Sequence, residues 1–365
     1  MAPANRGLRI GIDARAAAEV PAGTGRVARE LLRALAARED PHTYHCYART
    51  AWGELDERFT WRLVGLDDPW WHLRVAALAR HECDVFLSAN SFLTVCFLRI
   101  PAVPIVYDLV TFDPAMSPNR RSLAVERLTL GRAVARAAAI VSISQSTERA
   151  LIERFPRAAG KVTVAPLGTS PALGAPLSSQ ELAALPDSGF VLAVGTLEPR
   201  KNLPRLAEAY MQLPGPVRER HPLVVVGKLG WQTGPTRDAL AGLGERCIQL
   251  GYVSDGALGE LYRRCALFCY PSLGEGFGLP VLEAMAAGAP VLTSNVSSLP
   301  EVGGDAVAYC DPWSVESIAR ALHELLDDPG RRAQLSDAGR ARAATFTWSA
   351  TAAVVLETLE RAAGR

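Results

Sequence analysis

Two glutamates frame the turn in a glycine-rich stretch at residues 272–283. Glu275 comes before the turn, and Glu283 lies in the helical run after it, seven intervening residues beyond Glu275. Carboxylates accept hydrogen bonds from hydroxyl groups, so the pair would suit a sugar. They are poor partners for a phosphate, which other groups would have to meet.

The stretch itself supplies such groups. An apolar, strand-like run precedes it at 266–271, and its last residues begin an apolar helical run at 281–287 until Gly288. It is therefore predicted to turn from the carboxyl end of a strand into a helix N-terminus. Bare N–H groups and the positive end of the helix dipole favour a phosphate there. A nucleotide sugar fits such a pocket; an ordinary turn followed by a solvated Glu283 is the alternative.

A basic pair is predicted to reach the same edge from another strand. The apolar run 190–195 leads into a short loop where Pro199 suits a helix start and Asn202 a helix N-cap. Arg200 and Lys201 would then be fixed at the carboxyl end of that strand. Two cations there would neutralise a diphosphate, Arg with paired donors and Lys as a point charge. The alternative is a solvated basic pair beside a helix start.

A second glycine loop occurs near the start of the chain. The apolar run 8–13 is followed by Gly23, Thr24 and Gly25, and an amphipathic helical pattern covers 26–37. This order of strand, glycine loop and helix predicts another phosphate site, although a tripeptide of this kind is more often a plain turn.

The elements that must position these residues alternate between strands and helices. Such alternation predicts parallel sheets with helices on both faces, and ligands then bind at the carboxyl ends of the strands. The segment 170–188, rich in Pro, Gly, Ala and Ser, is predicted to link two Rossmann-like units. Strands are expected at 8–13, 42–48, 61–66, 84–87, 103–107, 140–144 and 161–166, and then at 190–195, 223–227, 247–251, 266–271, 290–293 and 307–311.

The composition limits the function classes. Lys and Arg number 39 against 38 Asp and Glu, so no overall field would recruit nucleic acid. The seven cysteines form no CxxC pair and are expected to be free thiols in a reducing cytoplasm, without a metal. No apolar run reaches the ~20 residues of a membrane span, and no signal-peptide core is seen. We expect a soluble cytoplasmic protein, and a peripheral contact at the inner face of the membrane stays open.

The second half of the chain resembles the retaining glycosyltransferases of family four, which have the GT-B fold. Their signature of two glutamates separated by seven residues matches Glu275 and Glu283, and 251–255 and 298–302 resemble neighbouring motifs of the family. The segment 195–202 resembles the basic loop of bacterial members that build surface polysaccharides, such as mannosyl- and rhamnosyltransferases. Several motifs in the right order make the resemblance specific.

The resemblance implies two α/β domains of Rossmann type that face each other across a cleft. Residues 1–175, joined by a crossing helix at 348–365, would bind the acceptor, and 188–347 would bind the donor. Catalytic roles would fall to Glu275, Arg200, Lys201 and Asp108. Donor binding would fall to Gly23, Thr24, Gly25, Thr196, Tyr252, Val253, Phe277, Gly278, Leu279 and Glu283.

Within that set the resemblance implies a division of labour. Glu275 would accept hydrogen bonds from the donor sugar, and Glu283 would bind the ribose hydroxyls. The basic pair would hold the diphosphate and stabilise charge on the leaving nucleotide. Backbone amides of 277–279 and the first glycine loop would complete the phosphate site, and main-chain groups near Tyr252 would meet the base.

Two residues depart from the family pattern. Thr196 stands where the basic loop often has an Arg, so one phosphate contact would be missing or supplied by Arg200. Tyr107 precedes Asp108 where related proteins often have a His, and a phenol of pKa near ~10 does not replace an imidazole. Asp108 is then the polar group expected to meet the acceptor.

The expected activity is a retaining hexosyl transfer from a nucleotide-diphosphate sugar, GDP-mannose-like or a dTDP- or UDP-sugar. The acceptor would be a polysaccharide, a lipid-linked precursor or a small natural product, and no cofactor or metal is expected. A non-catalytic nucleotide-sugar-binding protein and a sugar-nucleotide epimerase of GT-B fold are the alternatives. Base, sugar, acceptor linkage and oligomeric state do not follow from the sequence.

Overall fold

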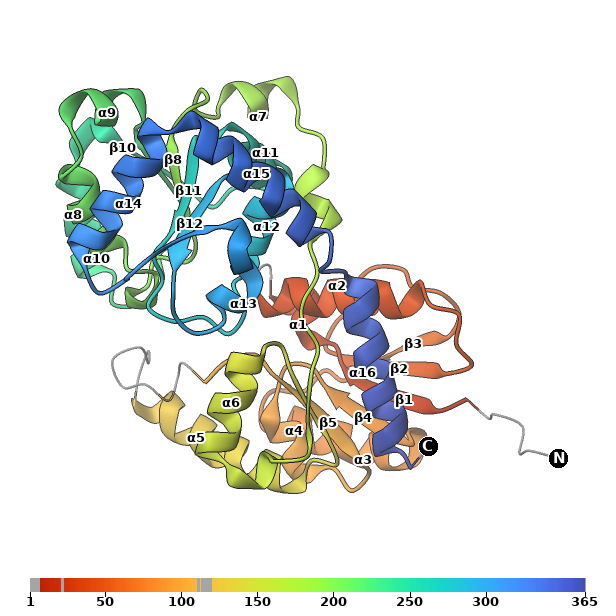
Figure 1. The fold of residues 1–365 in the computed structure, drawn as a ribbon. Helices are drawn as coiled ribbons and strands as arrows, with labels where there is room; N and C mark the ends of the chain where they lie inside the picture. Colours follow the sequence, from red (N-terminus) through yellow and green to blue (C-terminus); the bar gives the residue numbers. More distant parts are fainter. Residues whose placement is uncertain (1–6, 21–22, 110–111, 113–119, 365) are drawn as a thin grey trace. The chain divides into compact units, whose positions relative to one another are not determined.

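The structure, a computed structural model, describes residues 7–20, 23–109, 112 and 120–364. These residues form two compact units (Figure 1). Unit 1 holds the described residues up to Phe112, those from 120 to Gly168, and the final segment from Thr347. Unit 2 runs from Thr169 to Phe346.

In the described part of the chain, unit 1 is built on a seven-stranded parallel sheet with the order β3-β2-β1-β4-β5-β6-β7. Strands β4 and β5 are buried along their whole length, as expected for apolar strands covered on both faces. The strands are β1 (Arg9–Asp13), β2 (Thr43–Ala48), β3 (Phe59–Leu63), β4 (Val85–Ser88), β5 (Ala102–Val106), β6 (Ile140–Ser142) and β7 (Val162–Val164).

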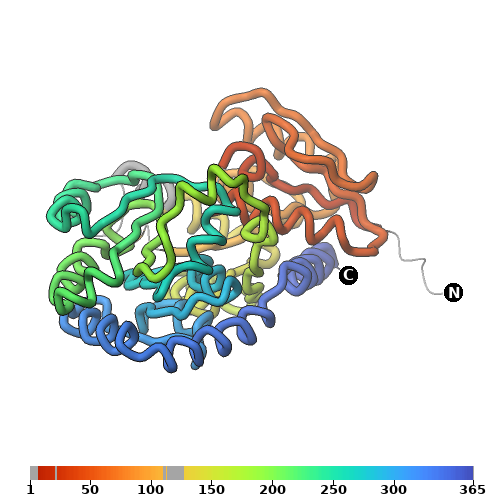
Figure 2. Tube along the Cα trace, turned by 90° about the horizontal axis from the view of Figure 1, so that it is seen from above, coloured from red at the N-terminus to blue at the C-terminus, as the bar shows by residue number. Residues whose placement is uncertain are grey.

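The last helix, α16 (Trp348–Ala362), belongs to unit 1, which confirms the predicted return of the chain. It packs on α2 and on strands β4 to β7, and its course can be followed in Figures 1 and 2. It buries Val355, Leu356 and Leu359. The other helices of unit 1 are α1 (Arg15–Glu19), α2 (Thr24–Ala36), α3 (Trp70–Glu82), α4 (Phe92–Phe97), α5 (Arg120–Arg136), α6 (Gln145–Arg154) and the 3-10 helix η2 (Pro156–Ala158).

Unit 2 has a six-stranded parallel sheet with the order β10-β9-β8-β11-β12-β13. Strands β8 and β11 are neighbours, although their sequences are far apart, and this pairing brings the predicted basic loop and the glycine-rich turn to one sheet edge. The strands are β8 (Val191–Val194), β9 (Leu223–Val226), β10 (Cys247–Gly251), β11 (Leu267–Tyr270), β12 (Val291–Ser294) and β13 (Ala308–Cys310).

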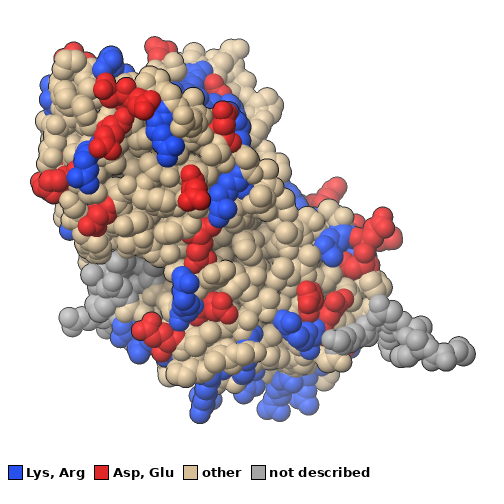
Figure 3. Space-filling model, in the orientation of Figure 1, with Lys and Arg blue, Asp and Glu red and all other residues tan. Residues whose placement is uncertain are grey.

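Helices cover both faces of this sheet (Figure 1). Acidic and basic side chains are interspersed over the face of unit 2 seen in Figure 3, in keeping with the net charge of +1. The helices are η3 (Pro171–Gly174), α7 (Ser179–Ala183), η4 (Pro199–Lys201), α8 (Leu203–Met211), α9 (Gly215–Arg220), α10 (Gly234–Ala241), η5 (Gly244–Arg246), α11 (Asp255–Arg264), α12 (Leu279–Ala287), α13 (Leu299–Gly303), η6 (Gly304–Ala306), α14 (Val315–Asp327) and α15 (Pro329–Ala343).

The segment predicted as a linker, 170–188, is instead part of unit 2 and contains η3 and α7. Helix η3 packs closely on α11, because a Cβ at Gly259 would lie 1.9 Å from the carbonyl oxygen of Leu173. The chain leaves unit 1 at Gly168 and returns at Thr347. These two points touch, since a Cβ at Gly168 would lie 2.4 Å from the amide nitrogen of Trp348.

Candidate active site

The loops that follow β8 and β11 are joined by hydrogen bonds. The carbonyl oxygen of Arg200 accepts from the N–H of Leu273 (2.8 Å) and from the hydroxyl of Ser272 (2.9 Å). Asn202 is buried with a φ of 60°, a conformation that Asn tolerates better than most residues. Its amide nitrogen donates to the carbonyl oxygens of Pro271 (3.0 Å) and Pro312 (2.7 Å). Asn202 is the N-cap residue of α8, as predicted, but its side chain makes no cap hydrogen bond and instead ties three loops together.

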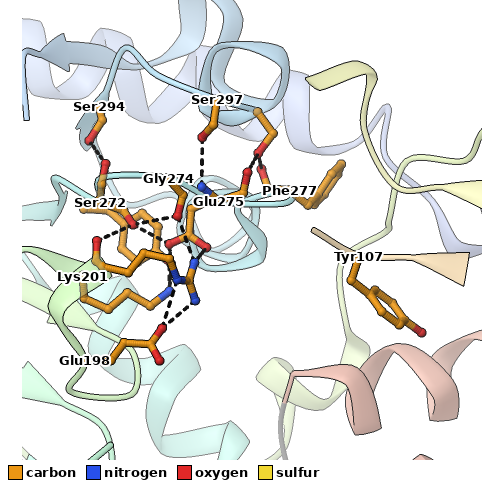
Figure 4. A network of polar contacts seen from close by, with 12 residues as sticks. Tyr107, Glu198, Lys201, Ser272, Gly274, Glu275, Phe277, Ser294 and Ser297 are labelled. Atoms are coloured by element: carbon orange, nitrogen blue, oxygen red, sulfur yellow. Dashed lines mark hydrogen bonds and ion pairs between the residues drawn. The ribbon is translucent and has the colours of Figure 1, made fainter. Parts of the chain in front are cut away.

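Glu275 is the centre of a buried polar cluster (Figure 4). Its Oε1 accepts hydrogen bonds from Lys201 Nζ (2.8 Å), Tyr270 OH (2.8 Å) and Ser272 Oγ (2.6 Å). Its Oε2 pairs with the guanidinium of Arg200. The same guanidinium pairs with Glu198 at 2.6 Å, so the two cations face two carboxylates. The structure thus brings together the predicted residues Arg200, Lys201 and Glu275.

The electrostatics of the cluster keep Glu275 ionised. Burial alone would raise the pKa of this carboxyl, but Lys201, Arg200 and the hydrogen bonds outweigh it and lower the pKa to about 2. Burial lowers the pKa of Lys201, and the Glu275 charge opposes that shift. The about four acceptor positions of a carboxylate are divided equally between its two oxygens, and Oε2 has one recorded donor whereas Oε1 accepts from three. Oε2 therefore keeps capacity for a hydroxyl.

The start of α12 presents backbone donors beside this cluster. Gly278 has a φ of 107°, and a Cβ there would lie 2.8 Å from the side chain of Leu299. The hydroxyl of Ser298 donates to the carbonyl oxygens of Glu275 and Phe277, both at 2.9 Å, and so fixes the turn. Among the described residues, no protein acceptor is recorded for the N–H groups of 277–279. These donors are available to an anion.

Glu283 lies on α12 and is only 3% exposed, so the alternative of a solvated helix residue is wrong. The hydroxyl of Tyr262, on α11, donates to its Oε2 at 3.4 Å. The two glutamates of the predicted pair therefore have different surroundings: Glu275 faces cations, whereas Glu283 lies among helices. No contact between these two carboxylates is recorded in the described part of the chain.

Comparison with known proteins follows the same division of the chain. A model described as "Glycosyltransferase Family 4" matches residues 21–173, and one described as "Glycosyl transferases group 1" matches 176–342. The O-antigen chain mannosyltransferase B of Escherichia coli is 36% identical over 261 residues, which are 68% of this chain and 67% of that protein. The chain belongs to glycosyltransferase family four.

Solved structures agree with the GT-B fold of this family. The sucrose-phosphate synthase of Thermosynechococcus elongatus has a TM-score of 0.77 at 21% identity, over 97% of this chain and 98% of its own. Anabaena HepE, solved with UDP-glucose, has a TM-score of 0.76 at 18% identity, over 97% of this chain and 100% of its own. At these identities the likeness establishes the fold of the glycosyltransferase.

In unit 1 of the glycosyltransferase, packing explains why one residue of the first glycine loop is a glycine. Gly23 has a φ of 57° and precedes α2, which begins at Thr24. Gly25 is buried, and a Cβ there would lie 1.8 Å from the carbonyl oxygen of Val20. The approach of α2 to the segment after α1 thus requires a glycine at this position. Phosphate binding by this loop stays a prediction.

Tyr107 and Asp108 follow β5, as expected. The hydroxyl of Tyr107 donates to the carbonyl oxygen of Ala89 at 2.7 Å, and burial raises the pKa of this phenol. Tyr107 therefore ties two strand ends together as a neutral hydrogen-bond donor. Asp108 is half-buried, and its expected role toward an acceptor stays a prediction.

Sequence reasoning missed a buried polar cluster at the end of β1. Asp13 is fully buried and pairs with Arg15, whose guanidinium lies 3.8 Å from the ring centroid of Trp71. Arg15 also pairs with Asp68 at 3.1 Å. The signal in the sequence that could have found this cluster is the pair Asp13 and Arg15, two positions apart where an apolar run ends. Burial raises the pKa of Asp13, and Arg15 opposes that shift.

The residues expected to meet the base lie after β10. Tyr252 is 55% exposed and Val253 is half-buried. Thr196, after β8, is exposed. Lys228, which the sequence reasoning did not single out, lies with its Nζ 4.4 Å from the centroid of the Tyr252 ring. A cation directly after the apolar run 223–227 was the signal that could have found it.

Among the described residues, no group of three or more His, Cys, Asp or Glu side chains is placed to hold a metal ion. None of the described helices is long and apolar enough to span a bilayer.

Proposed function

We propose that this chain is a retaining hexosyltransferase whose donor is a nucleotide-diphosphate sugar, GDP-mannose-like or a dTDP- or UDP-sugar. The observation that carries the proposal is the buried cluster of Arg200, Lys201 and Glu275 beside the bare N–H groups of 277–279. This edge offers cations and backbone donors to a diphosphate, and carboxylate oxygen to sugar hydroxyls.

In the reaction, the bond from the anomeric carbon to the diphosphate oxygen breaks, a bond to an acceptor hydroxyl oxygen forms, and the proton of that hydroxyl passes to the departing diphosphate. Negative charge develops on the departing nucleotide diphosphate. Arg200 and Lys201 are fixed by Glu275 and Glu198 before the donor arrives, so they stabilise that charge without rearranging. Glu275 would accept a sugar hydroxyl through Oε2.

The named relatives support the choice of sugar and acceptor. The Escherichia coli relative is an O-antigen chain mannosyltransferase, which supports a mannosyl group and a polysaccharide acceptor. A solved neighbour of the same fold holds UDP-glucose, which supports a nucleotide-sugar donor. The residues 188–347 would bind this donor, and 1–175 with 348–365 the acceptor. No metal would be required, so turnover should survive EDTA.

The first test is a thermal-shift panel with UDP, GDP, dTDP and ADP and their sugars. A ligand that binds the folded state raises its melting temperature by mass action. The sugar nucleotide with the largest shift is then supplied with oligomannose acceptors, and NMR of the product reads the anomeric configuration. No shift with any nucleotide would refute the proposed donor class, and an inverted product would refute retention.

The second test is Lys201→Met, with Lys201→Arg as the charge-conserving partner. Loss of the cation should lower kcat/KM about 100-fold or more, as for the loss of one electrostatic contact to a leaving group. Lys201→Arg should recover part of it. Circular dichroism must show that both variants are folded. If folded Lys201→Met turns over at the wild-type rate, the role proposed for the basic pair in the reaction is refuted.

A further inference from the structure

The buried cluster of Arg200, Lys201, Glu198 and Glu275 has no net charge. Arg200 pairs with Glu198 at 2.6 Å and also with Glu275, and Lys201 pairs with Glu275 at 2.8 Å. Two cations and two carboxylates sum to zero. Each phosphate of a nucleotide diphosphate brings a negative charge, so a further cation at this edge would strengthen binding beyond what the backbone N–H groups of 277–279 supply.

Lys228 lies on the segment next to the basic loop. The N–H of Leu197 donates to the carbonyl oxygen of Lys228 at 2.8 Å, and Leu197 and Leu229 form a parallel bridge. The two segments approach closely, since a Cβ at Gly227 would lie 1.9 Å from the carbonyl oxygen of Gly195. Lys228 is exposed, and it follows β9 at the carboxyl edge where β8 also ends. It therefore stands beside Thr196, at the entrance to the basic loop.

The ammonium of Lys228 contacts an aromatic ring, which does not neutralise its charge. Its Nζ lies 4.4 Å from the centroid of the exposed Tyr252 ring, and no carboxylate partner is recorded for it in the described residues. Such a cation–π contact orders the ammonium without cancelling its charge. The chain has three lysines; Lys161 donates to the carbonyl oxygens of Val134 and Ala137, and Lys201 is paired. Lys228 is thus the lysine that remains available to an anion.

We propose that Lys228 binds the diphosphate of the nucleotide and that the ring of Tyr252 positions its ammonium at the sheet edge. This inference rests on the proposed function. Lys228 supplies the net positive charge that the cluster around Glu275 lacks. In this assignment the ring of Tyr252 acts through Lys228, and the main-chain groups near Tyr252 stay available to the base.

The test is isothermal titration of Lys228→Met with the nucleoside diphosphate that gives the largest thermal shift for the wild type. Its dissociation constant should rise about tenfold, whereas that of the matching nucleoside, read by NMR titration, should change less than about twofold. Arg220→Met is the matched control, because Arg220 is exposed and precedes β9 at the opposite edge of the sheet. It removes the same charge from unit 2 and should leave both constants unchanged.

Two results would overturn the assignment. Wild-type affinity of Lys228→Met for the diphosphate would remove Lys228 from the site, and an equal loss for nucleoside and diphosphate would place it at the base. A wild type that binds no nucleotide at all would instead refute the proposed function. The three cases are therefore distinguishable.

Tyr252 is tested by substitution and by labelling. Tyr252→Phe keeps the ring and should bind the diphosphate like the wild type, whereas Tyr252→Leu should weaken it about threefold. Acetylation of the lysines, read by mass spectrometry, should modify Lys228 in the free protein and spare it with the diphosphate bound, but not with the nucleoside. Lys161, which is half-buried, serves as the internal reference. If saturating diphosphate does not change the extent of acetylation of Lys228, the proposal is contradicted. It is also contradicted if Tyr252→Phe binds the diphosphate as weakly as Tyr252→Leu.

Discussion

Glu275→Gln should destabilise unit 2 by about 3 kcal/mol. The substitution keeps the shape of the side chain and removes the charge that faces Lys201 and Arg200. Lys201 then loses the one carboxylate partner recorded for it among the described residues, while Glu198 still pairs with Arg200. Leaving one member of a buried ion pair without its partner typically costs ~3–5 kcal/mol.

The pKa of Glu275 gives the same magnitude and a pH dependence. Burial opposes ionisation, yet the neighbouring cations lower the pKa from 4.5 to about 2. At about 1.36 kcal/mol for each pH unit, the ionised carboxylate contributes about 3 kcal/mol to the free energy of unfolding. Because the folded pKa lies below the unfolded one, this contribution is fully present above pH 4.5. It is lost as the pH falls toward about 2.

The assay is urea or thermal unfolding of wild type and Glu275→Gln from pH 3 to pH 8. For a unit of this size, each kcal/mol lost from the free energy of unfolding lowers the melting temperature by about 2–4 °C. The melting temperatures of the two proteins should therefore differ by roughly 6–12 °C at pH 7 and converge below pH 4.5. Glu260→Gln is the control, because Glu260 also pairs with two arginines, Arg263 and Arg264, but on the surface of α11. It should cost less than ~1 kcal/mol. If the two variants lose equal stability, the Glu275 cluster is not the buried anchor inferred from the structure.

Two further predictions concern unit 1. Gly25→Ala should lower the free energy of unfolding by about 1–3 kcal/mol in chemical denaturation, because its Cβ would meet the backbone of Val20; native stability with lost nucleotide binding would instead assign Gly25 to the phosphate site. His72→Gln should flatten the pH dependence of unit 1 stability between pH 6.5 and about 4. Burial lowers the pKa of His72 to about 4, so the unfolded chain takes up the proton first and the wild type loses stability as the pH falls through this window. A slope that survives the substitution would show that other groups cause it.

The sequence predicts the fold well where burial follows from local pattern. The apolar runs at β4, β5 and β11 are buried strands, and Gly288 ends α12 with a φ of 83°. Helix α1 was not expected, because five residues do not carry a helical period. The segment 170–188 has the composition of a linker, yet glycines of α11, distant in the sequence, allow η3 to pack there.

The candidate site was predictable in its residue types but not in its internal contacts. The strand ends placed Arg200, Lys201 and Glu275 at one edge, as the sequence indicated. Glu275 can be buried because Lys201 donates a hydrogen bond to it, and Lys201 lies 74 positions away in the sequence. The same limit explains Asn202: an Asn before a helix suggests a cap, but carbonyl oxygens 69 and 110 residues away bind its side chain instead.

Because α16 belongs to unit 1, its position at the end of the sequence determines the order in which the two units are completed during translation. The ribosome makes strands β1 to β7 and then the whole of unit 2 before α16 exists. Until then, α2 and strands β4 to β7 lack the apolar cover that Val355, Leu356 and Leu359 provide. The unit that begins first is therefore completed last, and during translation its uncovered face is the surface exposed to misassembly.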